Sequence, residues 1–210
     1  MIEKVEQGTP EWFAARLGNV TASRVADVIA KTKSGYSASR ENYMAQLICE
    51  RMTNTVAESY SNAAMQWGTE TEPLARAAYE SYADVLVDQI GYVPHPTIER
   101  AGASPDGLVG IDSLLEIKCP NSSTHIDTLI NEQVPSKYIT QMQWQMACTG
   151  RVWCDFVSFD PRLPDGLQLF VKRVERDAEY IAMLEQEVIK FLNELDEKIF
   201  KLNERLNHGN

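Results

Sequence analysis

The sequence A-S-P-D-G-L-V-G-I-D-S-L-L-E-I-K-C-P, residues 103–120, decides how the rest of the chain is organised. Its glycines are typical of turns, and the apolar run before the lysine predicts a short strand that pairs back as a hairpin. Because side chains alternate along a strand, Glu116 and Lys118 point to the same face. A partner strand that carries Asp106 would add a second carboxylate to that face.

Two carboxylates and a main-chain carbonyl form a hard oxygen site that suits Mg²⁺ or Mn²⁺. A lysine beside such a site can orient or help deprotonate a water molecule and neutralise charge on a phosphoryl group. An Asp-Gly turn and a Glu-x-Lys strand are each common in solvated hairpins, so that interpretation stays open. The metal site gains support because Glu116 and Lys118 lie inside an apolar run, where unpaired charges are costly.

The composition places limits on the class of protein. A length of 210 residues predicts a single domain over residues 1–210, and a hydrophobic fraction of 44% supports a sizeable core. No stretch approaches the ~20 apolar residues of a membrane span, and the first residues do not read as a signal peptide. Four scattered cysteines favour reduced, buried thiols in a cytoplasmic protein. A net charge of −10 argues against general affinity for nucleic acid, so a phosphate-binding protein of this composition must cluster its cations or use metal ions.

Two short helices are predicted near the N-terminus. Thr9 is a good N-cap for the first, which ends at Gly18, and residues 21–23 open the second. A helix start with hydroxyl groups and a nearby arginine, Arg16, is a candidate anion site. In the alternative interpretation the hydroxyls only cap the helix, and Arg16 faces solvent or pairs with Glu11.

Periodicity and turn residues divide the rest of the chain into further elements. The expected helices cover residues 41–52, a segment that begins after residue 68 and runs through residue 79, and residues 138–149. The expected strands cover residues 85–93, 97–103, 152–158 and 167–174. Residues 31–40 and 121–136 are rich in polar and small side chains and are expected to be loops. Glu70 and Glu72 are expected in the first turn of their helix, where they favour the helix dipole.

Two helices carry patterns of particular interest. In the helix over residues 138–149, Gln141 and Gln145 share one face, from which amides can contact phosphate or base edges. Residues 177–206 are expected to form a long C-terminal helix whose apolar residues recur every seven positions. These residues are Ile181, Val188, Leu195 and Leu202. The stripe is expected to be buried against the body of its own subunit.

Seven motifs, in order along nearly the whole chain, resemble those of the phage lambda exonuclease-type or YqaJ viral recombinase family within the restriction-endonuclease-like nucleases. They are E-Q-G-T-P-E-W at 6–12, R-L-G-N-V-T-A-S at 16–23, W-G-T-E-T-E at 67–72, S-P-D-G at 104–107, L-E-I-K-C-P at 115–120, Q-M-Q-W-Q-M at 141–146 and F-D-P-R at 159–162. The resemblance implies a mixed α/β (α+β) fold with a restriction-endonuclease-like core, in which a central mixed sheet is flanked by helices. It also implies two Mg²⁺ ions per site, which Mn²⁺ can replace.

The resemblance assigns roles by motif. The metal ligands would be Asp106, Glu116 and the Ile117 carbonyl, and Lys118 would handle the attacking water. Two further residues of the active centre would be Glu72 and Gln141. The terminal 5′-phosphate would be gripped by Arg16, Ser23 and Ser104.

The leading hypothesis is therefore a Mg²⁺-dependent 5′-to-3′ exonuclease that digests one strand of linear duplex DNA from 5′-phosphorylated ends and leaves 3′ tails for strand-annealing recombination. The resemblance adds a ring-shaped homotrimer, a single-strand annealing protein as partner, and the cytoplasm of a bacterial host with a phage or prophage origin. One alternative is a structure-specific endonuclease with the same metal core. The other is a non-catalytic module that binds DNA ends, which the presence of Asp106, Glu116 and Lys118 disfavours.

Overall fold

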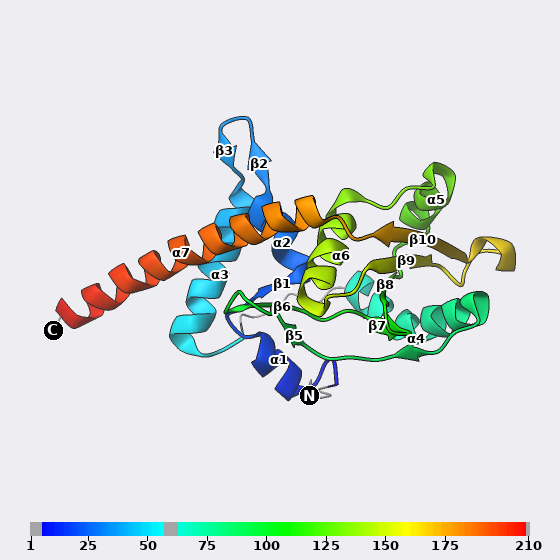
Figure 1. Ribbon diagram of the computed structural model, residues 1–210, viewed down its shortest axis with the longest axis horizontal. Helices are drawn as coiled ribbons and strands as arrows, with labels where there is room; N and C mark the ends of the chain where they lie inside the picture. The colour runs from blue at the N-terminus through cyan, green and yellow to red at the C-terminus, as the bar shows by residue number, and fades with distance from the viewer. Residues whose placement is uncertain (1–5, 57–62, 209–210) are drawn as a thin grey trace.

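The computed structural model describes residues 6–56 and 63–208 of the chain. Over these residues the protein is a mixed α/β structure in which helices flank mixed sheets and a long helix closes the chain, which confirms the predicted fold class (Figure 1). The helices are α1 (Pro10–Arg16), α2 (Val25–Ile29), α3 (Ala38–Thr53), α4 (Ala63–Ala83), α5 (Ser122–Asn131), α6 (Ser136–Thr149) and α7 (Ala178–His208), with short 3₁₀ turns η1 (Ala22–Arg24) and η2 (Asp165–Leu167). None of the described helices combines the length and the apolar character that a bilayer crossing needs.

The larger sheet has five strands in the order β10-β9-β8-β7-β4. Its strands are β4 (Val87–Asp88), β7 (Gly107–Val109), β8 (Ser113–Lys118), β9 (Trp153–Phe159) and β10 (Leu169–Glu175). β8 and β9 pair in parallel across the connection made by α5 and α6, and the other neighbours are antiparallel. Along β8, Leu114 packs with apolar residues of α6 and Leu115 with those of α4. Because side chains alternate, Glu116 lies on the α6 side of the sheet.

The smaller sheet orders three short strands as β1-β6-β5. Its strands are β1 (Val20–Thr21), β5 (Val93–Pro94) and β6 (Ala101–Ala103). The strands predicted over residues 85–93 and 97–103 are too long, since each shrinks to pairs or triplets of residues that enter a sheet. Proline lacks the N–H that a ladder requires, so Pro94 and Pro96 limit pairing in this segment.

Both segments predicted as loops contain regular structure, so that prediction is wrong. Residues 31–40 form the hairpin of β2 (Lys31–Thr32) and β3 (Gly35–Tyr36), followed by the start of α3. Residues 121–136 contain α5, where the Asn121 side chain accepts a hydrogen bond from the Thr124 N–H at 2.9 Å. Asn, Ser and Thr favour loops and helix caps alike, so composition alone does not separate the two.

Helix α4 reaches further toward the N-terminus than predicted. It already includes Ala63, so Glu70 and Glu72 lie inside the helix and not in its first turn. Gly68 does not mark the start of the helix but lies inside it, because a glycine in a helix interior costs only about 1 kcal/mol relative to alanine. Further along, Ala75 and Tyr79 pack α4 against the larger sheet. This contact holds the acidic side chains of α4 near the end of β8.

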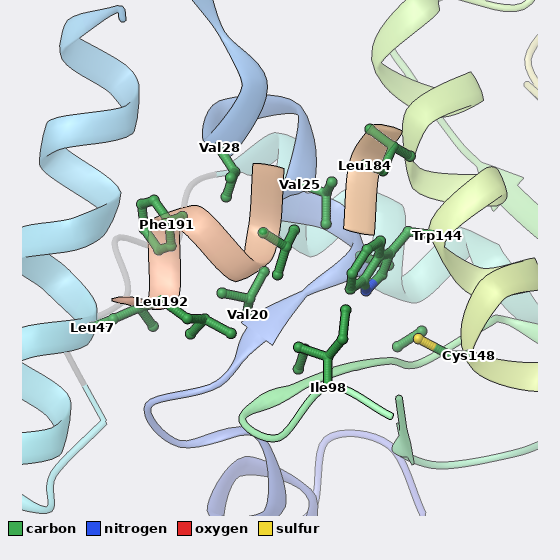
Figure 2. Close-up of a cluster of buried hydrophobic side chains, with 14 of the residues drawn as sticks. Val20, Val25, Val28, Leu47, Ile98, Trp144, Cys148, Leu184, Phe191 and Leu192 are labelled. Atoms are coloured by element: carbon green, nitrogen blue, oxygen red, sulfur yellow. The ribbon is translucent and has the colours of Figure 1, made fainter. Parts of the chain in front are cut away.

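The main hydrophobic core joins α2, α3, α6 and α7 to the smaller sheet. Figure 2 shows the side chains around the Trp144 ring of α6, which include Val20, Val25, Ile98 and Leu184. Trp144 also donates a hydrogen bond from Nε1 to the Gly102 carbonyl at 3.3 Å. The core therefore fixes α6 relative to β6, and with it the glutamines that α6 carries.

Helix α7 begins beside α6, passes α2 and α3, and then projects beyond them (Figure 1). Ile181, Val188 and Leu195 are buried as predicted, but Leu202 is 40% exposed, so the prediction that the whole stripe is buried is wrong. The reason is length. A helix of 31 residues is roughly 46 Å long, and its last turns extend past the elements that cover its first half.

Candidate active site

Strand β8 brings Glu116 and Lys118 to one face, as its alternation predicts. The Glu116 side chain is fully buried, and the Lys118 ammonium forms an ion pair with its Oε1. Burial disfavours the charged lysine, but the carboxylates of Glu116 and Asp106 outweigh that effect and raise the pKa of Lys118. The side chain is therefore an ammonium at neutral pH, and it can offset negative charge in this centre.

Two amides of α6 hold the Glu116 carboxylate. Gln141 donates from Nε2 to Oε1, and Gln145 donates from Nε2 to Oε2, both at 2.6 Å. The two glutamines are four positions apart and share a helix face, as the sequence predicts. The sequence does not indicate their partner, because only the packing of α6 on the sheet brings them to a buried acid.

Asp106 precedes β7 and is anchored to the neighbouring strand. Its Oδ2 accepts a hydrogen bond from the Ile117 N–H at 2.7 Å. Burial, and then the charge of Glu116, raise the pKa of Asp106 well above its ordinary value, and Glu72 adds to the rise. Lys118 opposes this rise without cancelling it. The centre therefore holds more carboxylate charge than its lysine neutralises.

Asp106 and Lys118 line a cavity of about 610 Å³, which we call the acidic cavity. Its wall also includes Glu72, Ile117, Lys137 and Tyr138. Glu72 of α4 accepts a hydrogen bond on Oε1 from Arg76 at 2.6 Å. The Nζ atoms of Lys118 and Lys137 lie 5.2 and 4.7 Å from the centroid of the Tyr138 ring. The cavity thus combines carboxylates and cations within reach of one ligand.

The donors around the acidic cavity suit a hard divalent cation. Asp106, Glu116 and the Ile117 carbonyl offer only oxygen, the ligand type that Mg²⁺ prefers, and the excess negative charge favours a cation. Among residues 6–56 and 63–208, no group of three or more His, Cys, Asp or Glu side chains has the geometry of a metal site. The expected donor set includes only two side chains of these types, Asp106 and Glu116. Its third donor is a main-chain carbonyl, so the set does not form such a group.

Arg162, in the motif F-D-P-R, braces the wall of the acidic cavity, a role that the sequence does not indicate. Its Nε and Nη2 donate to the two carboxylate oxygens of Asp160 at 2.7 and 2.9 Å. These hydrogen bonds lower the pKa of Asp160 to about 2. The guanidinium also lies 4.3 Å from the centroid of the Trp67 ring and donates to the Pro120 carbonyl. Arg162 therefore connects α4 to the segment that follows β8.

A second cavity, of about 560 Å³, lies beside the N-terminal turn, and we call it the arginine cavity. Arg16, Ser23 and Arg24 contribute to its lining. Arg16 donates from Nη1 to the Ser104 Oγ at 3.1 Å, and its guanidinium lies 4.0 Å from the centroid of the Trp12 ring. Trp12 donates to the same Ser104 oxygen at 3.0 Å.

Two of the three residues predicted to grip a phosphate are thus in direct contact, and the third is close by. Arg16 bonds to Ser104, and Ser23 is exposed on the lining of the same cavity. Within residues 6–56 and 63–208, Arg16 makes no ion pair with Glu11, the alternative that the sequence left open. The arginine cavity and the acidic cavity both include Met65 in their linings, so they are neighbours.

The turn that carries Arg16 is fixed through its glycine. Gly18 has a φ of +67° and donates its N–H to the Glu50 Oε2 at 2.9 Å, while its carbonyl accepts from the Arg51 Nε at 2.8 Å. A Cβ at Gly18 would lie 2.7 Å from the Arg51 Cγ. A helical segment does open at residues 21–23, as a 3₁₀ turn that leads into α2. The Thr21 side chain makes no cap hydrogen bond, so the alternative in which it only caps the helix is wrong for Thr21.

Comparisons with known proteins identify the family and the fold of this chain. The model of the YqaJ-like viral recombinase domain matches residues 11–152. The crystal structure of an alkaline exonuclease (LHK-Exo) from Laribacter hongkongensis is 56% identical and superposes with a TM-score of 0.89, over 95% of this chain and 98% of that one. The structure of LHK-Exo in complex with dAMP is 57% identical, with a TM-score of 0.90 over the same shares.

Two more distant matches add less. A phage-related exonuclease from Haemophilus somnus 129PT is 16% identical, with a TM-score of 0.72 over 88% of this chain and 96% of that one, which supports the fold alone. An uncharacterized Escherichia coli (strain K12) protein, ExoD, is 31% identical over 72 residues, which are 34% of this chain and 80% of that protein.

Proposed function

The chain belongs to the YqaJ-like viral recombinase domain family, and we propose that it is a DNA exonuclease that removes one strand of linear duplex DNA in the 5′-to-3′ direction. A relative that is 56% identical over nearly the full length of both chains is an alkaline exonuclease, and the same enzyme has been crystallised with dAMP, a deoxynucleotide. In our proposal the substrate end carries a 5′-phosphate. The product is a duplex with a 3′ single-stranded tail, the substrate for strand annealing.

One observation carries this proposal: a carboxylate-rich centre and an arginine with no ion-pair partner in the described chain lie in neighbouring cavities. Hydrolysis of a phosphodiester needs charge stabilisation at the scissile phosphate. Recognition of a strand end needs a separate contact with the terminal phosphate. Asp106 and Lys118 line the cavity suited to the first task, and Arg16 lines the cavity suited to the second. Ser104, two residues before Asp106, connects them.

Asp106, Glu116 and the Ile117 carbonyl would hold Mg²⁺, with two ions per site and Mn²⁺ as a substitute. Bound ions of this kind polarise a phosphoryl oxygen and lower the pKa of a coordinated water. Lys118 keeps its ammonium beside the carboxylates, where it can orient a water and offset charge on the phosphoryl group. Gln141 keeps Glu116 in place, and Glu72 adds a further acceptor on the α4 side.

Arg16, Ser23 and Ser104 would bind the 5′-phosphate of the strand to be digested. An arginine offers paired N–H donors that match phosphate oxygens, and Arg16 already donates to Ser104. A phosphate held there sets the distance from the strand end to the scissile bond. This arrangement would release one nucleotide per step. We further propose, from the family resemblance, a ring-shaped homotrimer that works beside a single-strand annealing protein.

The test uses a linear duplex labelled at either the 5′ or the 3′ end of one strand, with and without Mg²⁺, and a covalently closed circle of the same sequence. We expect early release of the 5′ label as mononucleotide, an absolute need for the metal, and an intact circle. Cleavage of the circle would instead support a structure-specific endonuclease, and early release of the 3′ label would reverse the proposed polarity.

A further inference from the structure

Gln145 of α6 has an arrangement that packing alone does not explain. Its side chain is fully buried, and its Nε2 donates to the Glu116 Oε2 at 2.6 Å. Its own Oε1 is buried and has no hydrogen-bond partner in the described chain. A buried amide with one end unpaired is less favourable than an apolar side chain of the same shape. A methionine at this position would therefore pack better if filling space were the only requirement.

The two oxygens of Glu116 have different partners. Oε1 contacts both Lys118 and Gln141. Within the described chain, Oε2 accepts a single hydrogen bond, which Gln145 donates. Without it Oε2 would have no partner in the described chain, and only the contacts of Oε1 would resist rotation of the carboxylate about its last side-chain bond. Gln145 also cannot present its carbonyl instead of its amide, since an amide oxygen would repel the carboxylate oxygen.

We propose that Gln145 is a positioning residue that fixes the orientation of the Glu116 carboxylate and thereby sets the affinity of the acidic cavity for a divalent cation. This inference rests on the metal-dependent function proposed above. The residue would act through Glu116 without touching the substrate. Hydrogen bonds to a ligating carboxylate orient it, and loss of such a partner typically lowers metal affinity by 10- to 100-fold.

Gln143 provides a matched control on the same helix. It is also a buried glutamine, at 2% exposure, but it is away from Glu116. Its Nε2 donates to the Glu175 carbonyl at 2.7 Å, and its Oε1 accepts from the Asp177 N–H at 2.9 Å. Both ends of this amide are paired, and they join α6 to the last residue of β10 and to the segment between β10 and α7. Its role is therefore structural.

The experiment measures Mn²⁺ binding to the full-length protein without DNA, by isothermal titration calorimetry, for the wild type, Gln145→Met and Gln143→Met. Thermal unfolding of each protein is recorded in parallel. We expect Gln145→Met to raise the Kd for Mn²⁺ by about 10- to 100-fold. Gln143→Met is expected to lower the unfolding temperature and leave that Kd unchanged. Gln145→Asn, a shorter amide that keeps a polar group in place, should weaken Mn²⁺ binding as well, and it serves if the methionine variant does not fold.

The outcomes separate this inference from the function on which it rests. A wild type that binds Mn²⁺ and digests DNA, with a folded Gln145 variant of unchanged Kd, overturns the role of Gln145 alone. Equal weakening of Mn²⁺ binding in the Gln143 and Gln145 variants also overturns it, because the effect would then be structural. A wild type that digests DNA but does not bind Mn²⁺ overturns the metal site and this inference together.

Discussion

The acidic cavity and the arginine cavity are neighbours, yet they treat charge in opposite ways. In the acidic cavity Lys118 is paired with Glu116 and outnumbered by carboxylates. In the arginine cavity the guanidinium of Arg16 contacts a hydroxyl and a tryptophan ring. Although the chain has a net charge of −10, one cavity carries an excess of carboxylates and its neighbour holds an arginine that, among the described residues, has no ion-pair partner. The net charge of the whole chain does not reveal this difference between the two cavities.

The largest effect should come from removing a carboxylate from the acidic cavity. Asp106→Asn is expected to reduce Mg²⁺-dependent hydrolysis below detection, because it takes away an oxygen ligand while the amide can still accept from the Ile117 N–H. Initial rates on a 5′-phosphorylated duplex measure this. Glu70→Gln, an exposed acid on α4, is the control and should retain activity. A normal rate for the Asp106→Asn enzyme would remove Asp106 from the centre.

The same variant should fold at least as well as the wild type at neutral pH. The folded-state pKa of Asp106 is raised, so its ionised form opposes folding, and the wild type gains stability as pH falls and the carboxyl takes up a proton. We expect the unfolding temperature of Asp106→Asn to match or exceed that of the wild type at pH 7, with the difference shrinking toward acid pH. A difference that grows on acidification would contradict the raised pKa.

A smaller loss is expected at Lys118. Lys118→Ala should lower the single-turnover rate by about 10²-fold, the order of one electrostatic or acid–base contribution, and should leave Mn²⁺ binding in place. Lys118→Arg should rescue poorly, because a planar guanidinium does not reproduce a compact ammonium. Lys137→Ala, which removes the other cation beside the Tyr138 ring, is the comparison and should cost less. Full activity of the Lys118→Arg enzyme would argue against a positional role for the lysine.

Substitutions in the arginine cavity should change the preference between duplex ends more than they change the hydrolysis step. Arg16→Ala is expected to reduce the preference for 5′-phosphate over 5′-hydroxyl ends by about 10-fold, the size of a lost hydrogen bond to a charged group, and to spare metal binding. Arg24→Ala is the control within the same cavity, since Arg24 is paired with Asp27. The measurement is the initial rate on 5′-phosphate and 5′-hydroxyl duplexes for the wild type and for the Arg16→Ala and Arg24→Ala variants. A wild type that ignores the phosphate would leave the cavity without this role.

The smallest effect concerns the brace of the acidic cavity. Asp160 has a folded-state pKa of about 2, which is depressed, so its contribution to stability is present above its ordinary pKa and is lost as pH falls through about 2. Because Arg162 is 46% exposed, solvent screens the pair, and Asp160→Asn should cost about 1 kcal/mol at pH 7. Urea unfolding at pH 7 and near pH 2 should give a difference at the first and little at the second. A constant difference would show that the pair does not titrate.

Local patterns predict the parts of the site that lie on one element. Alternation places Glu116 and Lys118 on one face of β8, and helical spacing places Gln141 and Gln145 on one face of α6. Both follow from the geometry of a single element, which neighbouring parts of the chain do not change. The fold class and the family were likewise evident from the order of the motifs.

Contacts between distant elements were beyond the sequence. Nothing in a linear pattern indicates that Glu50 and Arg51 hold Gly18, or that Arg162 lies over Trp67, because each contact depends on how helices pack. The start of α4 was misjudged for a different reason. Gly68 only weakens a helix, and a weak local preference is overridden when later turns of the same helix are packed.

The contacting residues of the two sites are separated by different lengths of chain. This difference has a consequence for folding during synthesis on the ribosome. Arg16 and Ser104 are 88 residues apart, whereas Gln145 and Glu116 are 29 apart. At about 5–20 residues per second, a ribosome would need roughly 4 to 18 seconds between Arg16 and Ser104, but only about 1.5 to 6 seconds between Glu116 and Gln145. Loop-closure entropy adds about 1 kcal/mol to the longer connection. In a growing chain, Arg16 therefore waits longer for Ser104 than Glu116 waits for Gln145.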